Sequence, residues 1–250
     1  MDDAPFKAIA PYYDQLMDGI PYLWWYTYLV TLLDCHDAAP ERVLELGCGT
    51  GNLTEYFCLN EYDVTGVDIS SEMIEIAKNK ARAGGLAIDY YAQDAAELCL
   101  DAKFDLVFSV FDSLNNITEP DRMAQCFARV AQHLSSNGLF IFDLNTELAF
   151  ARKMFDQRYR RKEAKVRYDW RSAYDRKTRL CRIQMKFTVK NERNEDVDFE
   201  ETHIQRAYSD DEINRFLNDA GFHEIASYDA YSLRRPNKRS DRVFYVARKP

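Results

Sequence analysis

The sequence contains little of what a metal centre, a disulfide framework or a membrane anchor requires. It has six cysteines and four histidines in 250 residues, the cysteines are widely scattered, and no CxxC pair occurs. This pattern argues against a metal site and against disulfides, and it favours free thiols in a reducing cytoplasm. The longest apolar run, residues 22–33, is interrupted by Thr27 and Thr31 and is shorter than the roughly 20 residues that span a bilayer. We therefore expect a soluble, cytoplasmic protein without a bound metal.

Glycine and proline are also scarce, with 9 and 7 residues, which excludes a linker-rich or low-complexity chain. The acidic start, Met1-Asp2-Asp3, lacks the basic segment that opens a secretory signal. What the chain does have is 46% hydrophobic and 30% charged residues, the composition of a folded globular protein. Its length suits one domain of ordinary size, or one domain that carries an insertion.

Charge is distributed unevenly along the chain. Residues 1–157 hold 10 basic and 25 acidic residues, whereas residues 158–190 hold 13 basic and 3 acidic residues. Most of the basic residues in the second segment occupy alternate positions, opposite apolar ones, which is typical of the solvated face of a sheet. Two other interpretations stay open: a site for an anionic substrate such as a sugar nucleotide, and a surface that binds RNA.

The first 157 residues alternate short apolar runs with segments of helical periodicity. After two helical stretches, about 5–18 and 21–34, the pattern predicts five strands separated by helices. Strands that alternate with helices at this spacing form a parallel sheet through right-handed crossovers. The expected strands are 42–46, 62–67, 88–91, 104–110 and 139–143, and the clearest helices between them are 52–59, 72–83 and 120–133.

From about residue 160 the period of the pattern changes to two. Three consecutive segments within 165–206 alternate apolar and polar residues, which predicts an antiparallel sheet with one wet face. A helix over 210–220 and two strands, about 223–231 and 241–248, follow.

These patterns together predict an α/β protein. We expect a parallel sheet built from repeated βαβ units, followed by an antiparallel sheet and a last helix with two strands. The expected division is 1–157, 158–207 and 208–250.

The most informative segment, residues 45–52, reads Glu-Leu-Gly-Cys-Gly-Thr-Gly-Asn and lies between a predicted strand and a predicted helix. Glycines there let the backbone approach a ligand closely, and the helix N-terminus offers free N–H groups. A dinucleotide site would follow the pattern GxGxxG, but Asn52 occupies the place of the third glycine. The segment therefore favours S-adenosylmethionine (SAM) over NAD, because SAM has no pyrophosphate to seat.

Acidic residues follow the next two strands. Asp68 ends the second predicted strand, where a carboxylate can bind both hydroxyls of a ribose. Asp94 follows the third strand, where it can accept a hydrogen bond from an adenine amino group. Helix capping is the alternative role for each of them, but ligands of parallel sheets bind beyond the carboxyl ends of the strands. The glycine segment and the two acids, in this order, thus predict one nucleoside site.

On these residues the sequence resembles the class I SAM-dependent methyltransferases. The motifs are residues 43–52, 64–70, 93–95 and 104–108. Within that family it is similar to a group of small bacterial methyltransferases, with a layout like that of the aminosugar N-methyltransferases. The marks of this group are residues 13–17, Pro21-Tyr22 with Trp25, 112–115, 140–145 and 201–208. The resemblance covers nearly the whole chain and is specific for the cofactor but not for the substrate. It implies an α/β fold with a Rossmann-like, seven-stranded, mostly parallel sheet and an inserted antiparallel β lid. The N-terminal helices and the SAM-binding core would occupy 1–157, the lid 158–207, and the end of the core 208–250.

The resemblance implies a set of cofactor contacts. Gly47, Cys48 and Gly49 would pass under the methionine part of SAM, with Glu45 orienting the loop from beneath. Asp68 would hold the ribose, and the aromatic residues of the N-terminal helices would close over the cofactor; for Trp25, ordinary helix packing is an equal alternative. The complete predicted set is Tyr13, Trp25, Gly47, Cys48, Gly49, Asp68, Ile69, Met73, Asp94, Ala95 and Phe111.

Methyl transfer is an in-line displacement whose leaving group is already activated by its positive charge, so alignment supplies most of the rate. A base is needed only if the nucleophile carries a proton that must leave. His203, in the predicted lid, is the candidate for that base, with packing as the alternative. Tyr168, Trp170 and Arg206 are candidates for lining the substrate pocket.

The sequence thus predicts a methyltransferase that uses SAM, releases S-adenosylhomocysteine, and methylates N or O of a small-molecule acceptor. Two other functions stay open: an RNA methyltransferase that uses the basic segment 158–190, and a non-catalytic SAM-binding module. RNA is disfavoured because residues 111–115 lack the motifs of nucleic-acid base methyltransferases. An NAD(P) oxidoreductase is disfavoured by Asn52. We expect a monomer or a homodimer that does not bind membranes.

Overall fold

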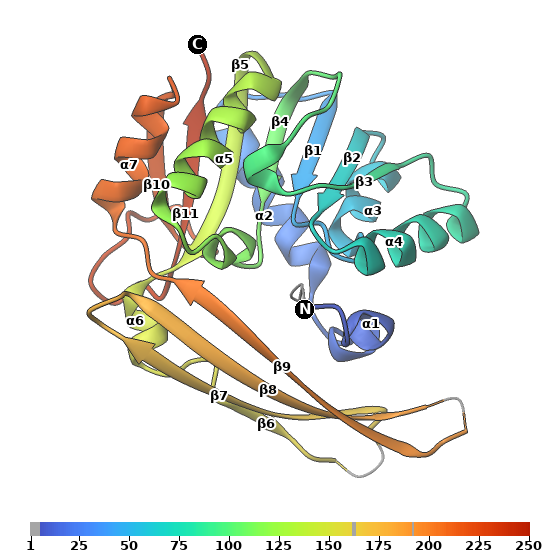
Figure 1. The fold of residues 1–250 in the computed structure, drawn as a ribbon. Helices are drawn as coiled ribbons and strands as arrows, with labels where there is room; N and C mark the ends of the chain where they lie inside the picture. Colours follow the sequence, from blue (N-terminus) through green and yellow to red (C-terminus); the bar gives the residue numbers. More distant parts are fainter. Residues whose placement is uncertain (1–5, 162–163, 192) are drawn as a thin grey trace.

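In the computed structural model, which describes residues 6–161, 164–191 and 193–250, a seven-stranded sheet forms the centre of the molecule (Figure 1). The strand order is β10-β11-β5-β4-β1-β2-β3. All neighbours are parallel except the pairs β5–β11 and β10–β11, so the prediction of a mostly parallel sheet is confirmed. The strands are β1 Arg42–Leu46, β2 Asp63–Asp68, β3 Asp89–Ala92, β4 Phe104–Ser109, β5 Leu134–Asn145, β10 His223–Asp229 and β11 Arg242–Arg248.

Helices cover both faces of this sheet because its central strands are apolar on both sides. On β5, for example, Phe140 and Phe142 pack against α5 and α7, whereas Leu139 and Ile141 belong to the core under α2 and α3. The helices are α2 Tyr22–Cys35, α3 Asn52–Leu59, α4 Ser71–Gly84, α5 Pro120–His133 and α7 Asp210–Asp219; the short elements are η2 Ala95–Glu97, η3 Ser113–Asn116 and α6 Glu147–Ala151. No described helix is long and apolar enough to cross a membrane.

A second sheet lies below the carboxyl ends of the parallel strands (Figure 1). It is antiparallel, with the order β6-β7-β8-β9, and its strands are β6 Gln157–Tyr159, β7 Val166–Asp175, β8 Leu180–Lys190 and β9 Asp196–Arg206. Alternate residues of β8 are buried, as the period of two predicts. The sequence pattern missed β6, which is only three residues long and exposed throughout. The exact bounds of the lid as a separate domain stay a prediction.

The N-terminal segment departs from the predicted helix over 5–18. Residues 6–9 form turns, followed by η1 Ala10–Tyr12 and α1 Tyr13–Leu16; the start of the predicted helix, residue 5, lies outside the described residues. Pro11 explains the interruption, since it has no N–H to donate to the residue four positions earlier. This segment crosses the end of the central sheet and contributes Ile9 and Ala10 to the core under the second sheet.

One side chain, Asn115, holds both ends of the connection that carries the second sheet. Its Nδ2 donates to the carbonyl oxygens of Asn145 and Arg206 at 3.2 and 2.8 Å. Its Oδ1 accepts from the amide of Asn145 at 2.9 Å. Asn115 is fully buried, so these bonds are shielded from water. The chain therefore leaves the core and returns to it at a single polar residue.

A buried ion triad joins the end of β4 to β5 and β11. The Arg242 guanidinium donates to Asp143, which is fully buried, and to Asp112 Oδ1 at 2.7 Å. The Asp112 amide in turn donates to Asp143 Oδ1 at 2.9 Å. Burial raises the pKa of the Asp143 carboxyl, while the charge of Arg242 lowers it. Arg242 is thus the counter-charge that lets two carboxylates lie next to each other in the interior.

We expect Arg242→Met to lower the free energy of unfolding by about 3–5 kcal/mol, because it leaves a buried carboxylate without its cation. Urea denaturation at neutral pH measures this change. The control is Arg234→Met. The Arg234 side chain is 81% exposed and lies 3.7 Å from Asp229, so this ion pair should contribute less than about 1 kcal/mol. Equal effects of the two substitutions would contradict the role of the triad.

Candidate active site

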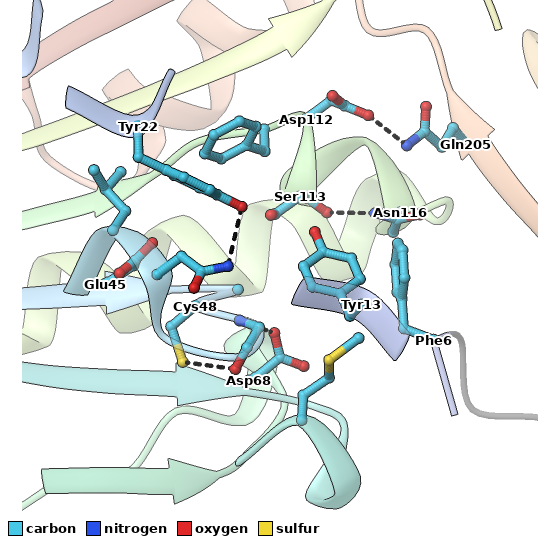
Figure 2. A pocket seen from close by; sticks show the side chains of 16 residues that line it. Phe6, Tyr13, Tyr22, Glu45, Cys48, Asp68, Asp112, Ser113, Asn116 and Gln205 are labelled. Carbon is cyan, nitrogen blue, oxygen red and sulfur yellow. Dashed lines mark hydrogen bonds between the residues drawn. The ribbon is translucent and has the colours of Figure 1, made fainter. Parts of the chain in front are cut away.

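Two adjoining cavities open at the carboxyl ends of the parallel strands. Here the neighbouring strands β1 and β4 are followed by α3 and α5, which cover opposite faces of the sheet. This is the expected binding position in an open α/β sheet. The aromatic cavity, shown in Figure 2, is lined by Phe6, Tyr13, Tyr22, Glu45, Gly47, Cys48, Gly49, Asn52, Leu53, Asp68, Met73, Phe111, Asp112, Ser113, Asn116 and Gln205. The strand-end cavity is lined by Phe6, Leu46, Gly47, Val67, Asp68, Ile69, Gln93, Asp94, Ala95, Ser109, Ser113, Leu114, Asn116, Ile117, Glu119 and Arg122.

The glycine segment forms the floor between the cavities. Gly47 has φ +71°, and a Cβ there would come within 2.6 Å of Ser113 Cβ, so only glycine fits. The amides of Gly47 and Cys48 both donate to the Val67 carbonyl, at 2.7 and 3.0 Å. The amide of Gly49 donates to Asp68 Oδ2 at 2.8 Å. Because these three amides are used within the protein, the segment offers a ligand a close surface rather than a set of free donors.

Asp68 occupies the border between the two cavities. Its carboxylate accepts from the amides of Gly49 and Ser70, the second at 2.9 Å. A carboxylate has about four acceptor positions, so it can hold the loop and still bind a ligand. Burial raises the pKa of this carboxyl, while the two amides lower it. Capping and ligand binding, which were alternatives on the sequence, are therefore compatible at this residue.

Asp94 and its neighbours line the strand-end cavity. Asp94 Oδ1 accepts from the Ala96 amide at 2.8 Å, and Oδ2 accepts from the Arg122 guanidinium at 2.7 Å. Arg122 comes from α5 and was not predicted from the sequence. Ala95 and the half-exposed Ile69 belong to the same lining. The residues predicted to contact adenine thus lie together around one largely apolar cavity.

Aromatic rings form the wall of the aromatic cavity. Tyr13, predicted from the sequence, and Tyr22, one of the marks of the resemblance, both point into it (Figure 2). Phe111 has φ +59°, and the next residue, Asp112, also lies in the left-handed region with φ +53°. Such strain clusters at functional sites. It turns the chain after β4 so that both residues line the cavity.

Trp25 lies outside the lining of both cavities, in line with helix packing, the alternative to its predicted contact with SAM. Its ring stacks on Phe111, with centroids 3.9 Å apart, and the Arg242 guanidinium lies 5.5 Å from its centre. Trp25 is therefore a support behind Phe111. On α2, Tyr22, one helical turn earlier, occupies the place that the prediction gave to Trp25.

Asn52, which occupies the place of a dinucleotide-site glycine, ties three helices to the loop. Its Nδ2 donates to Asp14 Oδ1 at 2.9 Å and to the Tyr22 hydroxyl at 3.1 Å. Its Oδ1 accepts from the Lys80 ammonium at 2.5 Å. The sequence identified Asn52 only by what it replaces. In the structure it positions the aromatic wall.

The lining of the aromatic cavity contains three acidic residues, Glu45, Asp68 and Asp112, but not all of them are charged. Burial raises the pKa of Glu45 to about 8, so this carboxyl is protonated at neutral pH, and it accepts from Thr54 Oγ1 at 2.5 Å. Burial also raises the pKa of Tyr22 to about 12 and that of Tyr13 well above its ordinary value. The lining described for this cavity contains no lysine, arginine or histidine. It therefore suits a cation better than an anion.

His203 does not reach either cavity in this structure, although the sequence made it the candidate base. It is 5% exposed, and its ring packs on Phe6, with centroids 4.2 Å apart. Its Nε2 lies 2.8 Å from Glu201 Oε2. Glu201 Oε1 accepts from the amides of Ala8 and Ile9 at 2.7 and 2.9 Å. The pair His203–Glu201 therefore anchors the N-terminal segment that places Phe6 over the cavities.

The three predicted substrate residues are also displaced from the site. Tyr168 and Trp170 lie on the inner face of β7 in contact with each other, and Tyr168 lines a separate groove against α1. Arg206 lies on the other face of β9, where it is 3.6 Å from Glu212 and stacks over Tyr208. Tyr168 and Trp170 thus lie on the predicted inner face but away from both cavities, because the period of a strand gives the face of a residue and not its position along the strand. Arg206 is displaced because it lies on the opposite face of β9.

The residue of β9 that does line the aromatic cavity is Gln205. It shares the inner face of the strand with Glu201 and His203, because these residues are two and four positions apart. Its Nε2 donates to Asp112 Oδ2 at 2.8 Å (Figure 2). The alternation that selected His203 extends to Gln205, so the sequence did contain a signal for it. Asp112 was recognised only as part of a motif and not as a site residue.

Comparison with known proteins agrees with this architecture. Residues 43–138 match the family model of the methyltransferase domain. The chain is 29% identical to a protein of Geobacillus sp. (strain WCH70) named as a methyltransferase, over 98% of this chain and 99% of the relative. The SAM-dependent methyltransferase of Clostridium acetobutylicum has a TM-score of 0.85 at 28% identity, over 98% of both chains. The sugar N-methyltransferase KedS8 of Streptoalloteichus sp. shares the fold, with a TM-score of 0.80 at 16% identity over 100% of this chain and 95% of that one.

The fold is the Rossmann-like fold of methyltransferases, and residues 43–138 match a methyltransferase domain, so this chain is an enzyme that carries such a domain. The chain is therefore similar to SAM-dependent methyltransferases, and it shares its fold with a sugar N-methyltransferase. The predicted family, fold class and enzymatic character are thus confirmed.

The raised pKa of Glu45 predicts a pH-dependent stability. Between about pH 4.5 and 8 the unfolded chain releases a proton that folded Glu45 retains, so the free energy of unfolding falls by about 1.4 kcal/mol per pH unit. Glu45→Gln removes this effect. The variant should therefore gain up to about 4 kcal/mol relative to the wild type from pH 5 to pH 8. Denaturant unfolding across this range measures the difference, and Glu61→Gln controls for loss of an exposed carboxyl. If the free energies of unfolding of the variant and the wild type differed by the same amount at every pH, Glu45 would be ionised in the folded protein.

Proposed function

We propose that this protein transfers the methyl group of SAM to a nitrogen or oxygen atom of a small-molecule acceptor. The observation that carries the proposal is the aromatic cavity itself, with Phe6, Tyr13, Tyr22 and Phe111 around it and no basic side chain in its described lining. Aromatic faces attract cations, and the sulfonium and ammonium groups of SAM are both cationic. The pyrophosphate of NAD would meet carboxyl groups there and no counter-charge.

The strand-end cavity supports the same cofactor. Its largely apolar lining suits the flat face of an adenine, while Asp68, at the border, can accept hydrogen bonds from ribose hydroxyls. The two cavities share Phe6, Gly47, Asp68, Ser113 and Asn116. A ligand with an adenosine end and a cationic end therefore fits across them.

When bound, SAM supplies a methyl group on a positively charged sulfur. The protein's part is to align the acceptor and to exclude water. Phe6 and Tyr13, both from the N-terminal segment, lie over the cavity (Figure 2). Because His203 and Glu201 hold that segment, we assign them to closure of the site rather than to proton transfer. A neutral amine needs no base before attack, which makes nitrogen the simpler acceptor atom.

The basic segment gives less support to an RNA acceptor. Three of its arginines, Arg158, Arg160 and Arg171, surround Asp169 at 2.8–3.0 Å. Arg167 and Lys190 both bond Asp196, at 2.6 and 2.7 Å. Cations already paired across their own sheet have less charge to offer phosphates. This favours the solvated sheet face among the three interpretations of the segment.

Calorimetry tests the cofactor. Wild-type protein should bind SAM at micromolar concentrations and show no comparable binding of NAD. Asp68→Ala should weaken SAM binding about tenfold or more, because charge-assisted hydrogen bonds contribute roughly 1.5–3 kcal/mol each. Asp63→Ala, at the other end of β2, is exposed and serves as the control. If folded Asp68→Ala protein bound SAM with unchanged affinity, Asp68 would have only a structural role, through its hydrogen bonds to the amides of Gly49 and Ser70.

Incubation with labelled SAM and fractionated cell extract tests the acceptor. Label should enter a low-molecular-mass product, and nuclease treatment of the extract should not change the yield. Nuclease-sensitive labelling that falls steeply with salt would instead establish an RNA methyltransferase. SAM binding without label transfer to any fraction would support the non-catalytic module.

A further inference from the structure

We infer that Gln205 binds the methyl acceptor directly, by accepting a hydrogen bond from an N–H or O–H group on, or next to, the atom that is methylated. The inference rests on the proposed function and narrows its substrate class. The acceptor would be an amine, which attacks in its neutral form, or an alcohol. It would carry no phosphate or carboxylate beside the reacting atom.

The starting observation is an acceptor atom without a partner. Gln205 is 4% exposed and lines the aromatic cavity, yet its Oε1 has no hydrogen-bond partner. Buried amide oxygens are nearly always bonded, and an unpartnered one costs free energy. Among the described residues with such an atom, only Gln205 lines this cavity; the others are Tyr90, Asn145, Asp169, Trp170, Tyr174 and Arg206.

The neighbouring charges fix which end of the amide is free. Gln205 Nε2 donates to Asp112 Oδ2 at 2.8 Å, and Asp112 Oδ1 accepts from Arg242 at 2.7 Å. Rotating the amide by half a turn would place its oxygen against a carboxylate oxygen, and neither atom could donate. The ion triad of Asp112, Arg242 and Asp143 therefore fixes Oε1 as the amide atom that has no partner within the described residues.

The chemistry of methyl transfer explains why an acceptor atom belongs there. An amine or alcohol must direct a lone pair at the methyl carbon. A protein oxygen that binds its N–H or O–H holds that group from another side and so orients the lone pair. Gln205 can do this without removing a proton. It comes from the second sheet, whereas the proposed cofactor contacts come from the central sheet and the N-terminal segment.

The surroundings select the charge of the acceptor. Within the described lining of the aromatic cavity, Asp112 is adjacent to Gln205 and no basic side chain is present. A phosphate or carboxylate close to the reacting atom would lack a counter-charge. An ammonium or hydroxyl group would meet a carbonyl oxygen, a carboxylate and aromatic faces instead.

The test uses wild-type protein loaded with S-adenosylhomocysteine and two cationic probes. Dimethylammonium has N–H groups, whereas tetramethylammonium has the same charge and none. Wild-type protein should bind dimethylammonium about tenfold more tightly than tetramethylammonium, the size expected for one hydrogen bond to a charged group. Gln205→Met should remove this preference. Gln205→Glu, which keeps an acceptor oxygen, should retain part of it. Gln184→Met, on the exposed face of the same sheet, should retain all of it.

The outcomes separate the two proposals. Failure to bind S-adenosylhomocysteine would contradict the proposed function. Normal binding of S-adenosylhomocysteine by all variants, with the preference lost only in Gln205→Met, would support the inference. A preference that survives in Gln205→Met would overturn it, since size would then be the cause. Absence of any preference in the wild type would overturn it as well.

Discussion

The ion triad of Asp112, Arg242 and Asp143 is the interaction on which the architecture of the site depends. It joins the turn after β4 to β5 and β11, and through Asp112 it reaches Gln205 on the second sheet. Two carboxylates share one guanidinium in the interior, so removing Arg242 leaves both without a counter-charge. Arg242 also lies over the Trp25 ring, which in turn stacks on Phe111. The aromatic wall and the polar end of the cavity therefore have a common support.

A second constraint is the scarcity of fixed positive charge at the place where the chemistry is proposed. Glu45 is protonated at neutral pH because burial raises its pKa to about 8. The nearby tyrosines are neutral at their ordinary pKa of about 10, and burial raises that pKa further. Several basic residues of segment 158–190 lie instead on the outer face of the second sheet, paired with Asp169 and Asp196. The two faces of the second sheet therefore differ in charge, with these basic residues on the outer face. The outer face remains wet, and the inner face closes over a site for neutral or cationic groups.

The sequence was sufficient for the central sheet because buried parallel strands are short apolar runs and the residues at their ends are placed by topology alone. For that reason the amino-acid pattern alone assigns Asp68 and Asp94 to the same edge of the sheet. For β9 the pattern was not sufficient. His203 and Gln205 share a face of this strand and differ in their distance from the cavity, which only Gln205 lines. That distance is set by tertiary packing. Helical spacing likewise does not reveal which ring of α2 lies behind another, so for Trp25 the sequence left packing and cofactor contact as equal alternatives.

Asn115 has a consequence for how such a protein can change over evolutionary time. Its single side chain bonds the chain at Asn145 and again at Arg206, so the sixty residues between them begin and end at one point of the core. Insertions, deletions or wholesale exchange of that segment need not disturb the strands that would hold the cofactor. The core and the inserted sheet are then free to diverge at different rates. Exchange of this segment would change the specificity for the acceptor, while the core residues proposed to bind the methyl donor stay the same.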